Sequence, residues 1–159
     1  MADKLSLDTE AVAIKPLAAA DFEAVIALDQ LLSHHSRRGF FDKRWQAMAR
    51  DPQAFVALGA YQGEVVCGFA LGHVLQGEFG GTAPVVVLDA LGVALDEQAQ
   101  GVGHALIGRL VDTVRELGGG ELRTQVAWDQ SGLASFFARC GFRLAPRLVL
   151  ERATGEATF

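Results

Sequence analysis

Residues 98–103 have the spacing most suggestive of chemistry, because two glycines stand there at the start of a predicted helix. The segment reads Gln-Ala-Gln-Gly-Val-Gly. An apolar, β-branched run, Val85–Leu88, precedes it, and leucines and valines at helical spacing follow it. Glycine lets a ligand approach the backbone closely, and the first N–H groups of a helix lack partners within the helix and attract anions. The segment is therefore a candidate phosphate cradle.

Two common phosphate-binding motifs do not match this segment. The Rossmann fingerprint requires a third glycine where this chain has Leu106, and a P-loop requires lysine where it has His104. The remaining pattern, Gln-x-x-Gly-x-Gly between a strand and an amphipathic helix, resembles the acyl-CoA-binding motif of the GCN5-related N-acetyltransferases (the GNAT family). The alternatives are a glycine-rich turn without a ligand and an unrelated nucleotide-binding domain.

A second motif, nearer the C-terminus, resembles the same family. Residues 136–142 read Phe-Phe-Ala-Arg-Cys-Gly-Phe and resemble the family's terminal helix, which ends in Tyr-x-x-x-Gly-Phe. Phe137 occupies the tyrosine position, and Gln130 falls by spacing where the family usually has an asparagine that bonds the pantetheine arm. The resemblance spans about residues 12–152. It implies the acyl-CoA N-acyltransferase fold, with acetyl-CoA as co-substrate.

The resemblance also implies which residues bind the cofactor. Backbone N–H groups of the turn and helix start would hold the CoA pyrophosphate, and the preceding strand would offer backbone groups to the pantetheine. Gly92 predicts a bulge that splays this strand from its neighbour, with close packing as the alternative. Arg139 could reach the 3′-phosphate, and a solvated arginine is the alternative. The implied cofactor-binding residues are Leu91, Val93, Leu95, Gln98, Ala99, Gln100, Gly101, Val102, Gly103, His104, Gln130, Phe137 and Arg139.

The implied reaction, acyl transfer to an amine, requires a group that removes a proton from the amine. The sequence departs from the family at two positions that could take part in this chemistry. In the family a tyrosine of the last helix often protonates the leaving thiolate, but Phe137, which stands at that position, has no hydroxyl. Gln125 stands where some members carry a catalytic glutamate. Asp89 matches the glutamate of polyamine-type members and is an acid in an otherwise apolar strand. We predict Asp89 as the catalytic base; the alternative is a structural carboxylate bonded to a neighbouring backbone N–H or serine.

Three histidines are candidates for binding the acceptor substrate. His34 and His35 lie in the polar segment between the first two predicted helices, which borders the acceptor site in this family, and His73 lies in a strand facing the same cleft. Each could instead be a solvated histidine, or could supply the base. Tyr61, the only tyrosine, ends a strand and is expected to be a surface turn aromatic. No His, Asp or Cys residues have metal-ligand spacing, so no metal site is predicted.

Composition narrows the class of protein. The chain has 159 residues, of which 50% are hydrophobic and 21% charged, which is typical of a folded domain. No apolar run reaches the roughly 18 residues that a membrane span needs, and two cysteines are too few for a disulfide scaffold. The net charge of −5 disfavours nucleic-acid binding and suits a cationic acceptor. We expect a cytoplasmic protein without nucleic-acid or membrane partners.

The expected elements position these motifs in a single domain, residues 11–159, after a flexible segment, residues 1–10. Helix 131–140 carries the second motif. We predict an α/β (α+β) fold with a mixed, splayed sheet flanked by helices. The predicted elements are strand 11–17, helix 21–32, helix 42–50, strands 53–61, 64–75 and 85–95, the helix that follows Gly101, strand 122–127, helix 131–140 and strand 147–152, with a short strand at 142–144 left open.

Together these features predict an N-acetyltransferase. It would move the acetyl group of acetyl-CoA to a primary amine, on a small molecule or a peptide, by direct attack. The alternative, suggested by Phe137 and Gln125, is a non-catalytic acyl-CoA-binding or regulatory module. Whether the chain forms a homodimer is left open.

Overall fold

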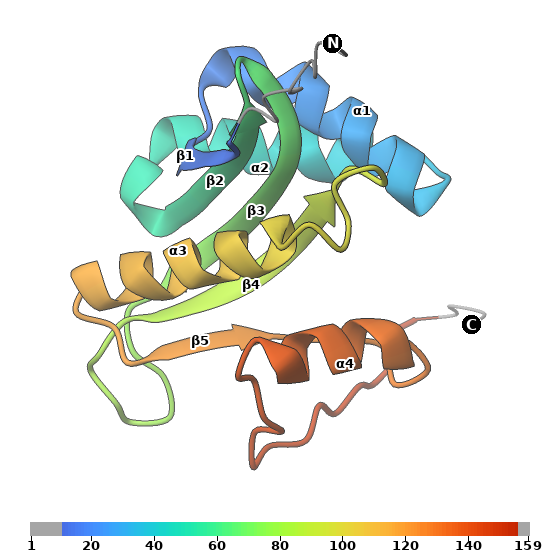
Figure 1. Cartoon of the computed structure of the whole chain (residues 1–159). Coiled ribbons are helices and arrows are strands. Elements are labelled where there is room, and N and C mark those ends of the chain that lie inside the picture. The colour runs from blue at the N-terminus through green and yellow to red at the C-terminus, as the bar shows by residue number, and fades with distance from the viewer. Residues whose placement is uncertain (1–10, 156–159) are drawn as a thin grey trace, which may run out of the picture. The chain divides into compact units, whose positions relative to one another are not determined.

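The computed structural model describes residues 11–155 (Figure 1). These residues fall into two units, the first extending to Gln125 and the second beginning at Val126. The segment predicted to be flexible, residues 1–10, lies outside the described residues. The assignment of residues 11–159 to a single domain stays a prediction.

A five-stranded sheet forms the centre of the first unit. Its strands lie in the order β1-β2-β3-β4-β5. The first four pair antiparallel, and β5 pairs parallel with β4, which confirms the predicted mixed sheet. The strands are β1 (Ala13–Pro16), β2 (Phe55–Gln62), β3 (Val65–Leu75), β4 (Val85–Val93) and β5 (Glu121–Thr124).

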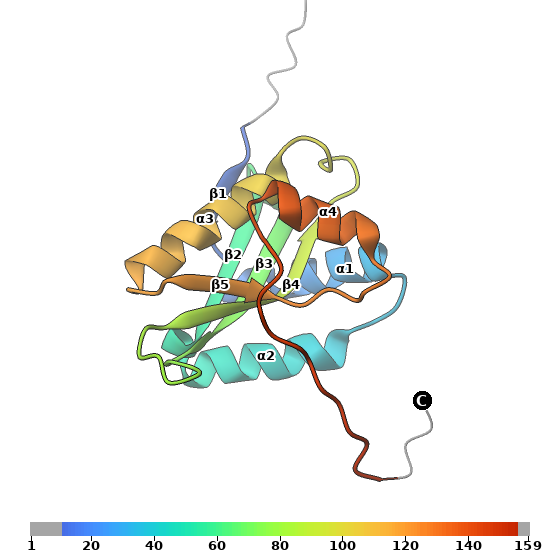
Figure 2. The same cartoon turned by 90° about the horizontal axis from the view of Figure 1, so that it is seen from below.

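Helices cover both faces of this sheet, with α3 on one face and α1 and α2 on the other (Figure 2). The helices are α1 (Phe22–Ser33), α2 (Arg38–Arg50) and α3 (Val102–Glu116), with short 3₁₀ turns at Ala19–Asp21 and Pro52–Ala54. A hydrophobic cluster fills the α1–α2 face, because apolar side chains of both layers alternate into it. Its buried members are Val25, Ile26, Leu28, Phe41, Phe69, Leu71 and Ala90.

The sheet splays between β4 and β5, as predicted. The two strands pair only from Val85↔Glu121 to Leu88↔Thr124, whereas β4 continues to Val93. The Thr124 hydroxyl donates to the carbonyl oxygen of Leu88 at 3.1 Å and closes the last paired position. Beyond Leu88, the edge of β4 that faced β5 has no strand partner among the described residues.

A β-bulge lies at Asp89, and not at Gly92 as predicted. In the β3–β4 ladder Leu71 pairs with Ala90 and its neighbour Gly72 pairs with Leu88, so Asp89 is the extra residue. Gly92 is in regular register opposite Phe69. A Cβ at Gly92 would lie only 2.5 Å from Cε1 of Phe69, so the reason for this glycine is close packing.

Helix α2 begins at Arg38, four residues before the predicted start at Asp42. Two ion pairs order the polar segment between the first two helices. The guanidinium of Arg37 bonds both carboxylate oxygens of buried Asp29 on α1, and Arg38 forms a two-bond contact with Glu23, with N···O distances of 3.0 and 2.7 Å. These contacts bring the start of α2 to α1, so helix forms earlier than its apolar pattern indicates.

The second unit contains α4 (Ser131–Arg139). Its end matches the predicted helix terminus, with Gly141 at φ 90° and the Phe142 N–H bonded to the Phe137 carbonyl at 3.0 Å. The predicted strand 147–152 is wrong, and the short strand left open at 142–144 does not form, because neither segment is paired in the described part of the chain. Pro146 lacks a backbone donor, and the Arg147 N–H bonds locally to the carbonyl of Ala145.

Candidate functional site

The unpaired edge of β4 presents backbone groups at Leu91 and Val93. The Ala94 N–H donates to the carbonyl of Cys67 on β3 at 2.8 Å. Backbone groups alternate along an antiparallel pair, so Gly92 also faces β3 while Leu91 and Val93 face the opposite edge. The Val93 carbonyl accordingly accepts a hydrogen bond from the side chain of Gln98 at 3.0 Å. This edge can therefore pair with an extended ligand.

A tight turn connects this edge to α3. Predicted strand residue Leu95 lies in the turn, and its side chain is exposed. Gly101 and Ala99 have left-handed φ values of 81° and 66°. Within the turn the Gln98 N–H bonds to Ala94 and the Gln100 N–H to Glu97. The side chain of Gln98 thus ties the turn to β4.

The start of α3 fits an anion. The first hydrogen bond of its opening turn runs from the Ala105 N–H to the Gly101 carbonyl. The N–H groups of Val102 and Gly103 come earlier in the chain, where a helix offers them no acceptor of its own. A Cβ at Gly101 would meet no atom within 4 Å, so the backbone there is approachable. With the dipole of a 15-residue helix behind them, these groups suit a phosphate. His104 is exposed in the same turn.

A cluster of three ionisable side chains surrounds the bulge. The Oδ2 atom of Asp89 lies 2.9 Å from Nη2 of Arg44 on α2 and 2.8 Å from Nδ1 of His73 on β3. The guanidinium of Arg44 lies 5.4 Å from the ring centre of Phe40 and 5.1 Å from that of Phe55. The side chains of Asp89 and His73 are 15% and 30% exposed. The bulge thus places a carboxylate and an imidazole beside the point where the sheet splays.

The other two predicted acceptor residues lie elsewhere. His34 ends α1 with φ 60°, and its N–H bonds to the Gln30 carbonyl. The Nδ1 atom of His35 lies 2.7 Å from the Ser33 carbonyl oxygen. Both side chains are exposed, and no hydrogen bond or ion pair within residues 11–155 joins them to the Asp89 cluster.

Three predicted cofactor-binding residues belong to the second unit. Gln130 is the N-cap residue of α4, and its carbonyl accepts the Ala134 N–H at 3.0 Å. Phe137 is buried, with its ring centre 5.4 Å from that of Phe136 and 5.0 Å from that of Phe142. Arg139 ends the helix and is exposed. Their roles stay predictions.

Sequence reasoning missed Arg44 and misjudged Tyr61. Arg44 stands one helical turn after Phe40, a spacing that is compatible with stacking of the two side chains. Nothing in the sequence indicates that Arg44 pairs with Asp89. Tyr61 is 4% exposed, so it is not a surface aromatic. Its hydroxyl donates to Oδ2 of Asp21 at 2.5 Å, which commits it to a structural contact.

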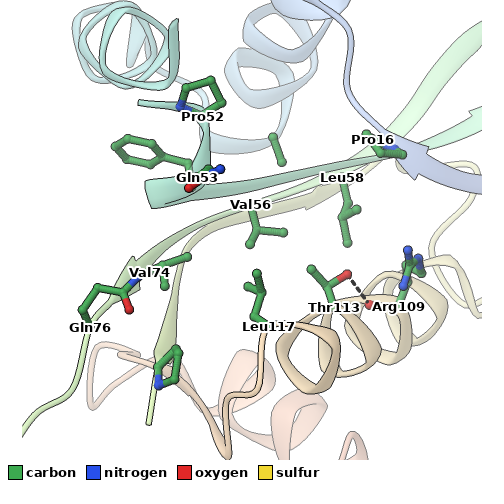
Figure 3. Close-up of a pocket in the computed structure, with 13 residues that line it drawn as sticks. Pro16, Pro52, Gln53, Val56, Leu58, Val74, Gln76, Arg109, Thr113 and Leu117 are labelled. Atoms are coloured by element: carbon green, nitrogen blue, oxygen red, sulfur yellow. Dashed lines mark hydrogen bonds between the residues drawn. The ribbon is translucent and has the colours of Figure 1, made fainter. Parts of the chain in front are cut away.

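The pocket shown in Figure 3, of about 600 Å³, lies elsewhere in the first unit. It is formed by β2, β3 and the C-terminal half of α3, with Val56, Leu58, Val74 and Leu117 among its lining residues. Arg109, its one ionisable lining residue, pairs with Glu116. None of the described residues that line the pocket is a predicted site residue, and its polar members Gln53, Gln76 and Thr113 are too weakly basic to accept a proton from an amine.

No helix in residues 11–155 is both long and apolar enough to span a bilayer. Over the same range, no three His, Cys, Asp or Glu side chains are grouped as a metal ion would require.

Comparisons with known proteins agree with this geometry. The profile of the acetyltransferase (GNAT) family matches residues 17–142. No curated protein matches the chain. Similar solved structures include the aminoglycoside antibiotic 6'-N-acetyltransferase AAC(6')-Ih from Acinetobacter baumannii, with 16% identity and a TM-score of 0.76 over 91% of this chain and 99% of that one.

Two further structures show the range of proteins that share this fold. AAC(6')-Iy, in complex with the bisubstrate analogue CoA-S-monomethyl-acetylneamine, has 16% identity and a TM-score of 0.78 over 91% of this chain and 99% of its own. A transcriptional regulator from Bacillus halodurans C-125 has 14% identity and a TM-score of 0.75 over 90% and 99%. At these identities the structures establish the fold alone. Because the family profile covers most of the sequence, the chain belongs to the GNAT acetyltransferase family.

Proposed function

We propose that this protein transfers the acetyl group of acetyl-CoA to a primary amine by direct attack. The observation that carries the proposal is the continuity of three features in the first unit. The unpaired edge of β4 leads into the anion-binding start of α3, and the Asp89 cluster lies at the other end of that edge. A thioester bound along the edge would have a proton acceptor within reach of its reacting carbon.

The residues of the β4–α3 segment fit the co-substrate of this family. Backbone groups of Leu91 and Val93 would pair with the pantetheine, and N–H groups at the start of α3 would hold the pyrophosphate. When bound, acetyl-CoA supplies an activated acyl group with a thiolate leaving group. Gln130, Phe137 and Arg139 of the second unit remain proposed contributors, as the family resemblance implies.

The proposed acceptor is a cationic amine on a small molecule or peptide. A carboxylate at the site and a net charge of −5 favour such an acceptor over a nucleic acid. Two similar structures are of aminoglycoside N-acetyltransferases, AAC(6')-Ih and AAC(6')-Iy. A cytoplasmic location stays a prediction, as does a homodimer, which sedimentation of the purified protein would test.

A second candidate function is a non-catalytic acyl-CoA-binding or regulatory module. Phe137 in place of the family's tyrosine favours it, and one similar structure is described as a transcriptional regulator. Release of free CoA thiol over a panel of aminoglycosides, polyamines and peptide amines separates the two. Amine-dependent release supports the enzyme, whereas binding of acetyl-CoA without release for any amine supports the module.

A matched pair of variants tests the cradle itself. Gly101→Val places a branched side chain where the pyrophosphate is expected, and we expect calorimetry to show at least a tenfold loss of acetyl-CoA affinity. Gly118→Val is the control, because Gly118 follows the other end of α3, also has a left-handed φ (77°) and also faces open space. Both variants carry similar backbone strain. Equal acetyl-CoA affinity in the two would contradict the assignment.

A further inference from the structure

We infer that His73 is the general base of the proposed acetyl transfer, with its Nε2 atom accepting the proton of the attacking amine, and that Asp89 positions its ring. The inference rests on the proposed function. Asp89, which the sequence predicts as the base, then has a supporting role. The proton transfer is assigned to His73 on the neighbouring strand.

The geometry of the His73–Asp89 contact sets the state of the ring. Nδ1 lies 2.8 Å from Oδ2, and an ionised carboxylate can only accept hydrogen bonds. In the neutral imidazole the proton therefore sits on Nδ1, which leaves the lone pair on Nε2. The His73 side chain is 30% exposed, twice the fraction of Asp89, so the imidazole is the more accessible of the two side chains.

The surroundings of Asp89 engage its Oδ2 atom in other contacts. Its Oδ2 atom already accepts from two donors, His73 and Arg44. Arg44 lies against the rings of Phe40 and Phe55 and is itself 18% exposed, so it is held in place. A proton on Oδ2 would displace one of these contacts. A carboxylate held in this way is suited to orient the imidazole and to stabilise it once it is charged.

The contact with Asp89, whose carboxylate meets Arg44 of α2, places His73 on the α2 face of the sheet. His73 pairs with Val87 on β4 and with Phe55 on β2, one position before the end of the β4–β5 pairing. The charged group that contacts the ring is Asp89 from β4, and Arg44 from α2 contacts Asp89 in turn. Strand β2 contributes the uncharged Phe55. The amine would approach from the α2 face, with the thioester along the open edge of β4.

The proposed step balances without a further reactant. A neutral amine forms a bond to the thioester carbonyl carbon, the C–S bond breaks, and the sulfur leaves as a thiolate with that electron pair. The surplus proton of the amine moves to Nε2 of His73, which becomes an imidazolium opposite the Asp89 carboxylate. The imidazolium then returns this proton to the thiolate, directly or through water, and the neutral ring is restored.

The substitution His73→Asn separates the roles of the two ring nitrogens. His73→Asn keeps an N–H donor near the Nδ1 position, and with it the bond to Asp89, but removes the basic Nε2 atom. We expect kcat to fall by about 10²–10⁴, the usual contribution of a general base, with an unchanged KM for acetyl-CoA. The base-dependent limb of the kcat/KM pH profile should disappear. Asp89→Asn should also lower kcat, and the double variant should be no slower than His73→Asn, because the pair acts as a unit.

The opposite pattern would overturn the inference. If His73→Asn retains kcat within about fivefold while Asp89→Asn loses a hundredfold or more, Asp89 is itself the base. If no amine is acetylated although acetyl-CoA binds, the proposed function fails instead, and the two failures are therefore distinguishable.

Nitrogen-15 NMR tests the ring without any acceptor. The chain has four histidines, so assignment is tractable. We expect His73 of the wild type to be the Nδ1–H tautomer, and Asp89→Ala to lose this preference. An Nε2–H tautomer in the wild type would contradict the inference, because the proposed acceptor atom would then already carry the proton.

Discussion

The hydroxyl of Tyr61 donates to Oδ2 of Asp21 at 2.5 Å, and the same oxygen accepts the Ala18 N–H at 3.0 Å. Lys15 Nζ lies 4.4 Å from the centre of the tyrosine ring. These contacts tie β2 to the segment that enters α1. The phenol therefore serves the fold, and a role in protonating the CoA thiolate is not needed to explain it.

Tyr61→Phe tests this structural role. Loss of the hydrogen bond should lower the free energy of unfolding by about 1 kcal/mol or somewhat more at neutral pH, while kcat stays within about twofold of wild type. Denaturant titrations at several pH values give the first quantity and the thiol-release assay the second. A large loss of kcat in a stable variant would instead identify Tyr61 as an acid in the reaction.

The same variant has a pH signature. Burial and the hydrogen bond to Asp21 raise the pKa of Tyr61 above its ordinary value of about 10. The native protein then holds this proton more tightly than the unfolded chain, so its stability contribution is complete below about pH 10 and declines as the pH rises further. We expect the stability difference between wild type and Tyr61→Phe to shrink above pH 10. A difference that grows with alkaline pH would contradict this interpretation.

At the scale of single residues, the sequence indicates reactive types better than it indicates their partners. Asp89 stands out because an acid interrupts an apolar strand. It does lie directly after Leu88, where the pairing of β4 with β5 ends. Its contact with Arg44 joins residues 45 positions apart through the packing of α2 on the sheet, and no local pattern encodes that distance. His34 and His35 are predicted from their place beside the family's acceptor site, but the contacts that the structure gives them are to Gln30 and Ser33 and not to the cluster.

Among the elements, β4 combines a splayed edge with close packing at Gly92. A methyl group there would approach Phe69 at 2.5 Å and Leu32 at 3.0 Å. Gly92→Ala should therefore destabilise the fold by about 1–3 kcal/mol, the usual cost of overpacking. Gly108→Ala is the control, since Gly108 lies within α3 and faces open space; it should stabilise by up to about 1 kcal/mol. Thermal unfolding of both variants measures this contrast, and equal effects would contradict it.

Elements with their own local signal were predicted well. The strand, turn and helix from Val85 to Glu116 were recognised because a β-branched run, two glycines and a 3.6-residue repeat follow one another. The stretch from Arg147 to Arg152 also contains a run of apolar residues, yet it is not a strand. A strand exists only through its partner, and composition cannot supply one. Its side chains Leu148, Val149 and Leu150 are exposed.

For the whole molecule, two short motifs were enough to predict the family and the mixed, splayed sheet. The bulge at Asp89 was not predicted, because a bulge is a mismatch between two strands and appears only in their register. The acceptor is likewise absent from any motif. Its identity depends on side chains that several elements bring together.

The bulge has a consequence for how this chain tolerates deletions. Removing Asp89 would leave every other β3–β4 pair in register, with Val87 opposite His73, Leu88 opposite Gly72 and Ala90 opposite Leu71. Removing Ala90 instead gives a chain of the same length, but it moves the carboxylate of Asp89 to the core position opposite Leu71.

We expect the protein lacking Asp89 to unfold cooperatively and to be inactive, at a cost of about 1–3 kcal/mol for the unpartnered Arg44. The protein lacking Ala90 should lose several kcal/mol more, because it buries a charge among apolar side chains, and its thermal transition should be lost or far lower. Equal melting temperatures would show that the register is not what places Asp89. If the expected contrast holds, the carboxylate is carried by an inserted residue that the sheet does not need. Deleting that one residue would then convert a catalytic strand into a purely structural one.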